Sequence, residues 1–386
     1  MAEYSGTVQE FTPETVSDDE LAQYMELATE QSYYLSGAGS KFSQIPLVMS
    51  KFDRWGNNMV VPNQELRGYT FVTRPHLNMF ASNLCQVDDL SLYNTTDPRS
   101  FNFAIRCLLD PKYCQHHSVI SDMIDINNPF MPLLSNCITD FSGHPDFTIE
   151  TETTEGGLFG EDLTFVKGFD QGARTYNYSL TVRDIAGGPI FSLFLAWVLW
   201  MGYVVRGNLS AHNEYIAGNR LCYTVSIYRF IMDPTKQYIT KWSKATGCFP
   251  TGIPFGAAFD FTSGQHYVEN TKEYNIPFIV NHVGYQKPQI LRDFNALVRR
   301  YNPDINKNFT KNKVAETDAE SAALDSSWHV VTNRPEDNFR GIPYIDMLGG
   351  KNQLVFMERE GQVTTDDIYE SYMAPLRARL QNLLSS

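Results

Sequence analysis

The stretch PIFSLFLAWVLWMGYVVR, residues 189–206, is the strongest structural signal in the sequence. Up to Val205 its only ordinary polar side chain is Ser192. Pro at the start, Arg206 in the last turn and Gly207 after it predict one complete, capped helix. At about 1.5 Å per residue the helix is roughly 26 Å long, slightly short of a hydrocarbon core of roughly 30 Å. We therefore expect a buried helix of globular length, with a membrane protein as an alternative.

Strand patterns lie on both sides of this helix. Tyr176 to Val182 alternates bulky and polar residues, and 223–231 is rich in β-branched and aromatic residues. The segment 237–242 is expected to pair with 223–231 across the turn at Asp233 and Pro234. Further strands are predicted at 147–154 and at 276–283, where Pro277 favours an edge strand or a strand beginning. A second helix, amphipathic, is predicted over 289–301.

A helix that is apolar on all sides needs cover on all sides, and one sheet covers only one of them. Trp197 and Trp200 fall on different sides of the predicted helix. We therefore expect them to contact another domain or subunit.

Two further segments have the character of recognition surfaces. RGYTFVTRPHLN, residues 67–78, reads as a strand that stops at a fixed polar corner formed by Arg74, Pro75 and His76. WSKATGCFPTGIP, residues 242–254, reads as a long structured loop that carries Trp242, Phe249 and Ile253. With the two helix tryptophans, these residues are the candidate assembly interface.

The charge of the chain is concentrated at one end. The 386 residues contain 31 Lys and Arg against 44 Asp and Glu, a net charge of −13, which argues against nucleic acid as the main partner. Residues 1–40 alone hold eight acidic residues and no Lys or Arg. We predict an acidic arm over 1–60 with a short helix near 17–31, a core over 61–301, a linker over 302–327, and an extension over 328–386 that ends in a helix. Within the core, 60–150 reads as loops and short strands.

No sequence pattern points to catalysis, and we expect no catalytic residue, cofactor or metal. Cys114, His116 and His117 form the one Cys/His cluster, and a metal site would need about two more ligands, for which Cys137 and His144 are candidates. The acidic residues Glu150, Glu152, Glu155, Glu161 and Asp162 fit either a solvated hairpin or the paired carboxylates of a hydrolase. The start of the sequence lacks a signal-peptide pattern, so we expect synthesis in a cytoplasm and no disulfides among the six cysteines.

Four segments together resemble virion structural proteins of large contractile-tailed bacteriophages. In that group a strand ends in an aromatic-Thr-Arg/Lys-Pro-x-Leu-Asn corner, matched here at 70–78. An apolar helix, a Ser-Ile-Tyr strand and a Trp-x-Lys-x-Thr-Gly-x-Phe-Pro-Thr segment follow, matched at 190–205, 225–230 and 242–251. The resemblance covers roughly residues 60–290.

The resemblance implies an α+β fold, mainly antiparallel β: a tail-tube-like β-barrel or sandwich with a packed apolar helix and terminal extensions. It implies a non-enzymatic structural protein of the phage tail in the virion, a baseplate or tube-terminal ring. Its partners would be copies of itself and other tail or baseplate proteins, with DNA only as transient cargo through a lumen and no membrane contact. The alternatives are a tail-associated carboxylate-dependent hydrolase and a head–tail neck component.

Overall fold

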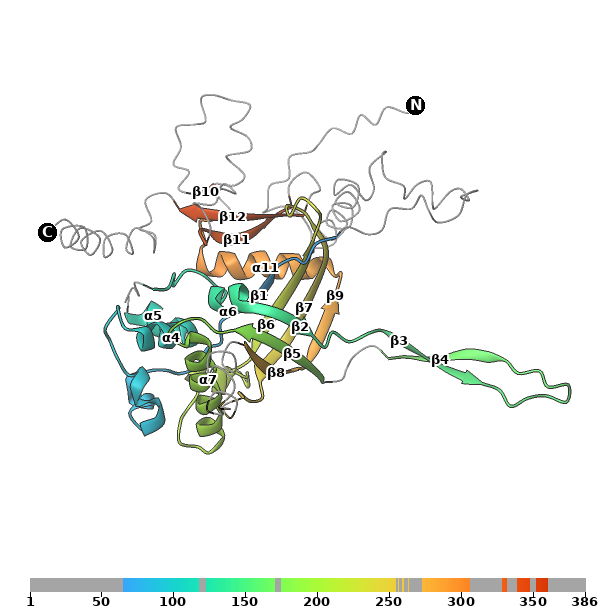
Figure 1. Ribbon diagram of the computed structural model, residues 1–386, viewed down its shortest axis with the longest axis horizontal. Coiled ribbons are helices and arrows are strands. Elements are labelled where there is room, and N and C mark those ends of the chain that lie inside the picture. The colour runs from blue at the N-terminus through green and yellow to red at the C-terminus, as the bar shows by residue number, and fades with distance from the viewer. Residues whose placement is uncertain are drawn as a thin grey trace, which may run out of the picture.

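The computed structural model describes residues 65–117, 123–170, 175–254, 273–305, 328–331, 339–347 and 352–359, and the single positions 256, 259 and 263. The expected acidic arm, most of the linker and the expected C-terminal helix lie outside these residues. A curved antiparallel sheet forms the centre of the molecule (Figure 1). Its strands pair in the order β1-β6-β7-β8-β5-β2, and β9 also pairs with β7. They are β1 (Thr70–Val72), β2 (Ile138–Ser142), β5 (Tyr176–Arg183), β6 (Val225–Met232), β7 (Ile239–Pro250), β8 (Glu273–Val280) and β9 (His282–Tyr285).

The strand patterns around the apolar helix are confirmed. β6 and β7 form the expected hairpin, with Phe230 opposite Trp242. Asp233 closes its turn, because its Oδ1 accepts hydrogen bonds from the backbone N–H groups of Gln237 (3.1 Å) and Tyr238 (3.0 Å). Such short-range carboxylate bonds are the reason that Asp is favoured in turns.

Two strand predictions were wrong in detail. The segment 242–254 is mostly not a loop, since β7 continues through it to Pro250. Gly247, at a φ of 65°, lies where the register with β6 shifts, so this glycine marks a β-bulge. Nor is β8 an edge strand, since it lies between β7 and β5. The Pro277 carbonyl accepts a hydrogen bond from the N–H of Thr251, so the missing donor of Pro277 faces β7 just where that strand ends.

The described strands do not close into a barrel, which corrects the barrel expectation. Between the two outer strands β1 and β2 the chain inserts helix α6 (Pro132–Cys137), which packs against β1 and β5. A side chain also spans the gap, because Nη2 of Arg67 donates to the carbonyl of Ile138 at 2.9 Å. A helix and a guanidinium therefore stand where backbone pairing would close the sheet.

Short helices, rather than the expected loops and short strands, make up much of the region between β1 and β2. They are α3 (Ala81–Leu84), the 3₁₀ helix η2 (Asp88–Tyr93), α4 (Phe101–Leu109) and α5 (Pro111–His117). The sequence pattern does not reveal them because each is shorter than the window of about 11–18 residues over which helical periodicity is recognised.

Two hydrophobic clusters lie on the two faces of the central sheet. One contains the apolar helix α7 (Pro189–Val205), which begins and ends where the sequence predicts, and receives Val225 and Ile227 from β6. The other contains the amphipathic helix α11 (Pro288–Tyr301) and receives Tyr228 and Phe230 from β6. A small sheet in the order β10-β12-β11 joins this second cluster, with β10 (Trp328–Val330), β11 (Ile342–Asp346) and β12 (Gln353–Arg359).

A long hairpin extends away from this body (Figure 1). It consists of β3 (Thr148–Thr153) and β4 (Thr164–Asp170), which pair only with each other in the described part of the chain. The expected strand at 147–154 is thus confirmed, and it belongs to an arm rather than to the core.

Candidate functional site

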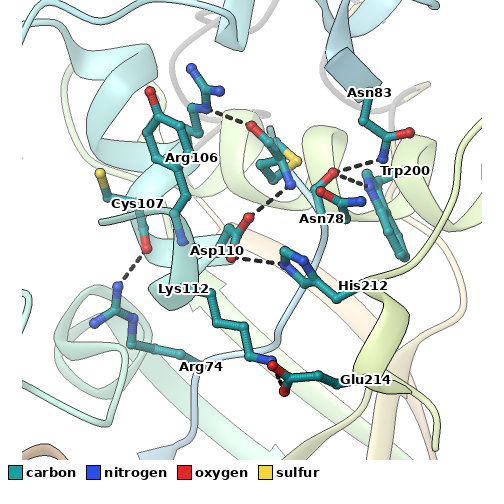
Figure 2. Close-up of polar contacts among 12 residues, drawn as sticks. Arg74, Asn78, Asn83, Arg106, Cys107, Asp110, Lys112, Trp200, His212 and Glu214 are labelled. Atoms are coloured by element: carbon teal, nitrogen blue, oxygen red, sulfur yellow. Dashed lines mark hydrogen bonds and ion pairs between the residues drawn. The ribbon is translucent and has the colours of Figure 1, made fainter. Parts of the chain in front are cut away.

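The corner that ends β1 is an internal junction. The Arg74 side chain, 3% exposed, donates hydrogen bonds to the carbonyl oxygens of Cys107 (2.5 Å), Ile126 (3.0 Å) and Asn128 (3.1 Å). Figure 2 shows the bond to Cys107. The guanidinium thereby fastens β1 to the end of α4 and to the segment before α6. Arg74 and the buried Pro75 are structural residues rather than surface contacts.

His76, the third residue of this corner, is half-buried. Its backbone N–H donates to the carbonyl of Cys222, and its ring stacks on Tyr215 at 5.5 Å between centroids. Burial, with a further contribution from Arg300, lowers the pKa of His76 to about 4. Its Nδ1 is buried without a hydrogen-bond partner in the described part of the chain.

A buried polar cluster that the sequence did not reveal lies beside this corner (Figure 2). Asp110, fully buried, accepts hydrogen bonds from the N–H groups of Met79 (2.9 Å) and Tyr113 (3.2 Å), and its Oδ1 lies 3.2 Å from Nε2 of His212. Arg106, also fully buried, donates to the Met79 carbonyl at 2.7 Å. The cluster joins the α4–α5 corner to the segment between α7 and α8 (Asn213–Ala217). Each of these hydrogen bonds joins two groups of the same chain, so the cluster has a structural role.

The three candidate tryptophans lie inside the chain. Trp197 and Trp200 are fully buried, and their Nε1 atoms donate to the carbonyls of Tyr223 (3.1 Å) and Asn78 (3.2 Å). Trp242 is buried in the second cluster and donates to the carbonyl of Lys287 at 3.0 Å. The expectation of tryptophans on a surface is corrected, because their rings fill the core of the protomer itself.

Helix α7 does leave one face outward, but different residues form it. Leu195 and Val198 are half-buried, and Val205 is 87% exposed. Their spacing of three and seven residues places them on one side of the helix. We call them the outer stripe of α7.

Phe249 and Ile253 remain partly accessible. Phe249 packs edge-to-face on Tyr223, and Ile253 packs against the first cluster. The assembly role of these two residues and of His76 stays a prediction.

A cavity of about 550 Å³ opens between the end of β1, strands β6 and β7, and helix α11. We call it the cationic groove and define it by Arg74, His76, Lys244, Asp293 and Arg300, all of which line it. Lys244 pairs with Asp293 at 2.9 Å, whereas the exposed Arg300 makes no ion pair with another described residue. These charges come from a strand end, a strand and a helix far apart in sequence, so sequence patterns alone do not bring them together.

The β3–β4 hairpin is exposed from Thr148 to Lys167. Every residue of β3 is exposed, and Leu158 and Phe159 in its loop are 94% and 90% exposed. The loop has a defined form, because the N–H of Gly157 donates to the Glu161 carbonyl (2.8 Å) and the N–H of Phe159 donates to the Glu161 carboxylate (3.0 Å). The hairpin therefore presents an apolar tip.

A sequence model of the family described as "Putative phage tail tube protein" matches residues 6–363, most of the chain. The chain belongs to the phage tail tube protein family. This confirms the resemblance drawn from the sequence and makes this tail tube protein a structural component of a phage tail.

Three solved structures are similar to this tail tube protein. The tube-terminating cap of the anti-feeding prophage has 16% identity over 41% of this chain and 83% of that chain, with a TM-score of 0.23. The sheath/tube terminator of the extracellular contractile injection system PVC has 12% identity, over 39% and 84%, with a TM-score of 0.22. The PVC sheath–tube complex has 13% identity, over 41% and 83%, with a TM-score of 0.23. No curated protein matches the chain.

The acidic residues weighed for a hydrolase lie on the arm of this tail tube protein. Glu150, Glu152, Glu155, Glu161 and Asp162 are all exposed. Paired catalytic carboxylates depend on environments that separate their pKa values, such as an apolar pocket around one of them. All five carboxylates are exposed to the same solvent on the hairpin, so the structure favours the interpretation as a solvated hairpin.

Among the described side chains of the tail tube protein, the remaining candidates for chemistry are not brought together. No group of three or more His, Cys, Asp or Glu residues in the described part of the chain is placed to hold a metal ion, and the side chains of His116 and His117 lie outside that part. His144 instead contacts the hydroxyl of Tyr178 through its Nδ1 at 3.1 Å. All six cysteines are free thiols. Among described helices, none has the length and hydropathy to cross a membrane.

Proposed function

We propose that the chain is a non-enzymatic ring-forming subunit at one end of a phage tail tube, in the baseplate or near the neck. The observation that carries the proposal is the β3–β4 hairpin, an arm that no other described part of its own chain covers. Family membership supports a place in the phage tail, and the exposed apolar surfaces of the chain support assembly with other subunits.

The β3–β4 hairpin is not expected to be stable by itself in an isolated monomer. A two-stranded hairpin alone is at best marginally stable in water. Phe165 and Val166 are 46% and 64% exposed, and as neighbours in one strand they point to opposite faces. Apolar side chains on both faces and at the tip gain from burial against a partner. The hairpin therefore has the properties of an assembly arm.

The outer stripe of α7 supplies a second surface for neighbours. Leu195, Val198 and Val205 leave an apolar line on the outside of a helix that has no charged residue before Arg206. Apolar helix faces of this kind are covered by a subunit in obligate assemblies. Copies of this chain and other tail proteins are the partners in this proposal, and DNA passes through the ring without staying bound.

Localisation in the particle tests the proposal. Gold-labelled antibody against an epitope-tagged chain, viewed by electron microscopy of intact virions, should mark one end of the tail. Electron microscopy of the purified chain should show rings or short tubes. Label on the capsid shell, or absence of the chain from purified particles, would overturn the proposal.

A further inference from the structure

We propose that the cationic groove of one copy binds the tip of the β3–β4 hairpin of a second copy. The inference rests on the proposed function, since it names the contact through which subunits join. It is based on the presence, in one chain, of a cationic groove and an acidic hairpin with an apolar tip.

The groove has an unbalanced charge. Arg74, Lys244 and Arg300 line it together with a single acidic residue, Asp293, which already pairs with Lys244. Because Arg74 is buried and bonded to backbone carbonyls, the exposed Arg300 is the lining cation that a partner can reach. Burial first, and then Arg300, lowers the pKa of His76 to about 4, so its imidazole is neutral at pH 7 and adds no positive charge to the groove. The partner that best fits the groove is therefore an anionic group with an acceptor for Arg300.

The groove also has apolar walls. Val225 from β6 and Ala296 and Leu297 from α11 line it beside the charges. A cavity of about 150 Å³ is enough to hold a benzene ring. At about 550 Å³ the groove has room for two large apolar side chains together with part of a backbone.

The hairpin is complementary in both respects. The segment 148–168 has five acidic residues and one basic residue, Lys167, for a net charge of −4. Glu155, Glu161 and Asp162 flank the exposed Leu158 and Phe159. In the docked state the two apolar side chains enter the groove, and the flanking carboxylates meet Arg300 at its rim. A desolvated ion pair makes an interface selective, because a wrong partner would leave one of the buried charges unpaired.

The contact joins different patches on the two copies. The hairpin extends away from the body that contains the groove (Figure 1), so its tip does not lie in the groove of its own chain. A head-to-tail interface of this kind leads to a ring when the rotation between copies closes, and to a filament when it does not. Both outcomes suit a protein of the tail tube family.

Disulfide trapping tests the contact directly. In the full-length chain with the exposed Cys85 replaced (Cys85→Ser), we combine Leu158→Cys at the hairpin tip with Ala296→Cys in the groove wall. Mild oxidation should give a ladder of multimers on a non-reducing gel. The matched control pairs Leu158→Cys with Leu92→Cys, which is exposed on η2, and should stay monomeric. A ladder no stronger than the control overturns the docking.

Charge reversal gives an independent measurement. Arg300→Glu should weaken self-association of the full chain at least tenfold in analytical ultracentrifugation at low salt. Adding Glu155→Lys and Asp162→Lys should restore part of the loss. Arg299→Glu is the matched control, because Arg299 is exposed on the same helix but does not line the groove. Equal effects of the two arginine reversals would contradict the docking.

The two levels of proposal can fail separately. If the wild-type chain forms rings and marks the tail, but Arg300→Glu assembles like Arg299→Glu, only the docking is overturned. If the wild-type chain is absent from the tail, the proposed function itself is overturned.

Discussion

Nε2 of His212 lies 3.2 Å from Oδ1 of Asp110, a carboxylate that is fully buried and that also accepts two backbone N–H groups. His212 precedes α8, and Asp110 joins α4 to α5. One side chain thus fastens three segments that are far apart in sequence. Buried polar groups of this kind are costly to leave unpaired.

Asp110→Ala should therefore destabilise the chain strongly. The substitution leaves the buried N–H groups of Met79 and Tyr113 without their acceptor. We expect a loss of about 3–5 kcal/mol in the free energy of unfolding, measured by urea denaturation. Glu273→Ala, which removes only an exposed pair with Arg183, should cost less than about 1 kcal/mol. Similar losses in the two variants would contradict a structural role for Asp110.

The tryptophans of α7 should affect folding rather than assembly. Because Trp197 is fully buried in its own chain, Trp197→Ala should cost about 3–5 kcal/mol in the free energy of unfolding. Val205→Ala, at an exposed position of the outer stripe, should leave the free energy of unfolding within about 0.5 kcal/mol and weaken self-association. Denaturation and ultracentrifugation of both variants separate the effects. A Trp197→Ala chain with unchanged stability would show that the ring does not support the core.

Stability should fall as the solution is acidified from about pH 6.5 toward pH 4. Burial lowers the pKa of both His76 and His144 to about 4, whereas an unfolded histidine titrates near 6.5. The unfolded chain therefore binds more protons in this range, so these groups favour the folded state above pH 6.5 and lose that contribution as the pH falls. Each histidine accounts for up to about 3 kcal/mol at pH 4.

The pH dependence can be assigned by substitution. His144→Gln keeps a partner for the Tyr178 hydroxyl but removes the titration. Its free energy of unfolding, measured between pH 7 and pH 4, should fall by about 3 kcal/mol less than that of the wild-type chain. Parallel curves for the two chains would exclude His144 as a cause.

Local sequence patterns were enough to predict the elements that carry the core. Strand β5 and helix α11 display regular apolar periodicity, α7 displays an uninterrupted apolar run with end signals, and β6 is rich in β-branched and aromatic residues; all four lie where these patterns predict. The end of β7 was missed because Gly247 and Pro250 are turn residues in most contexts, and the bulge that accommodates Gly247 depends on its partner strand.

The candidate site was harder to predict than the core elements, because its residues are brought together by tertiary contacts. Arg74 reads as a surface corner in the sequence, but the carbonyls that hold it come from α4 and from the segment before α6, which no local pattern connects to β1. Arg300 and Lys244 approach each other only because α11 crosses β7. The first strand of the protruding hairpin, by contrast, was visible as alternation at 147–154 beside acidic residues, whereas its second strand β4 and its projection from the body were not predicted.

The acidic N-terminal segment, which lies outside the described residues, should act in incorporation into the tail. Residues 1–40 carry eight acidic residues and no Lys or Arg, and blocks of like charge are typical of interaction tails that bind a surface of opposite charge. Deleting residues 1–35 should leave the thermal unfolding temperature of the chain nearly unchanged and reduce its amount in purified particles, measured by mass spectrometry. A chain of full length with the eight acids replaced by Gln or Asn separates charge from length, and it should show the same reduction. Unfolding of the deletion variant would instead assign the segment to the core, because an arm that only binds a partner adds nothing to the stability of the free chain.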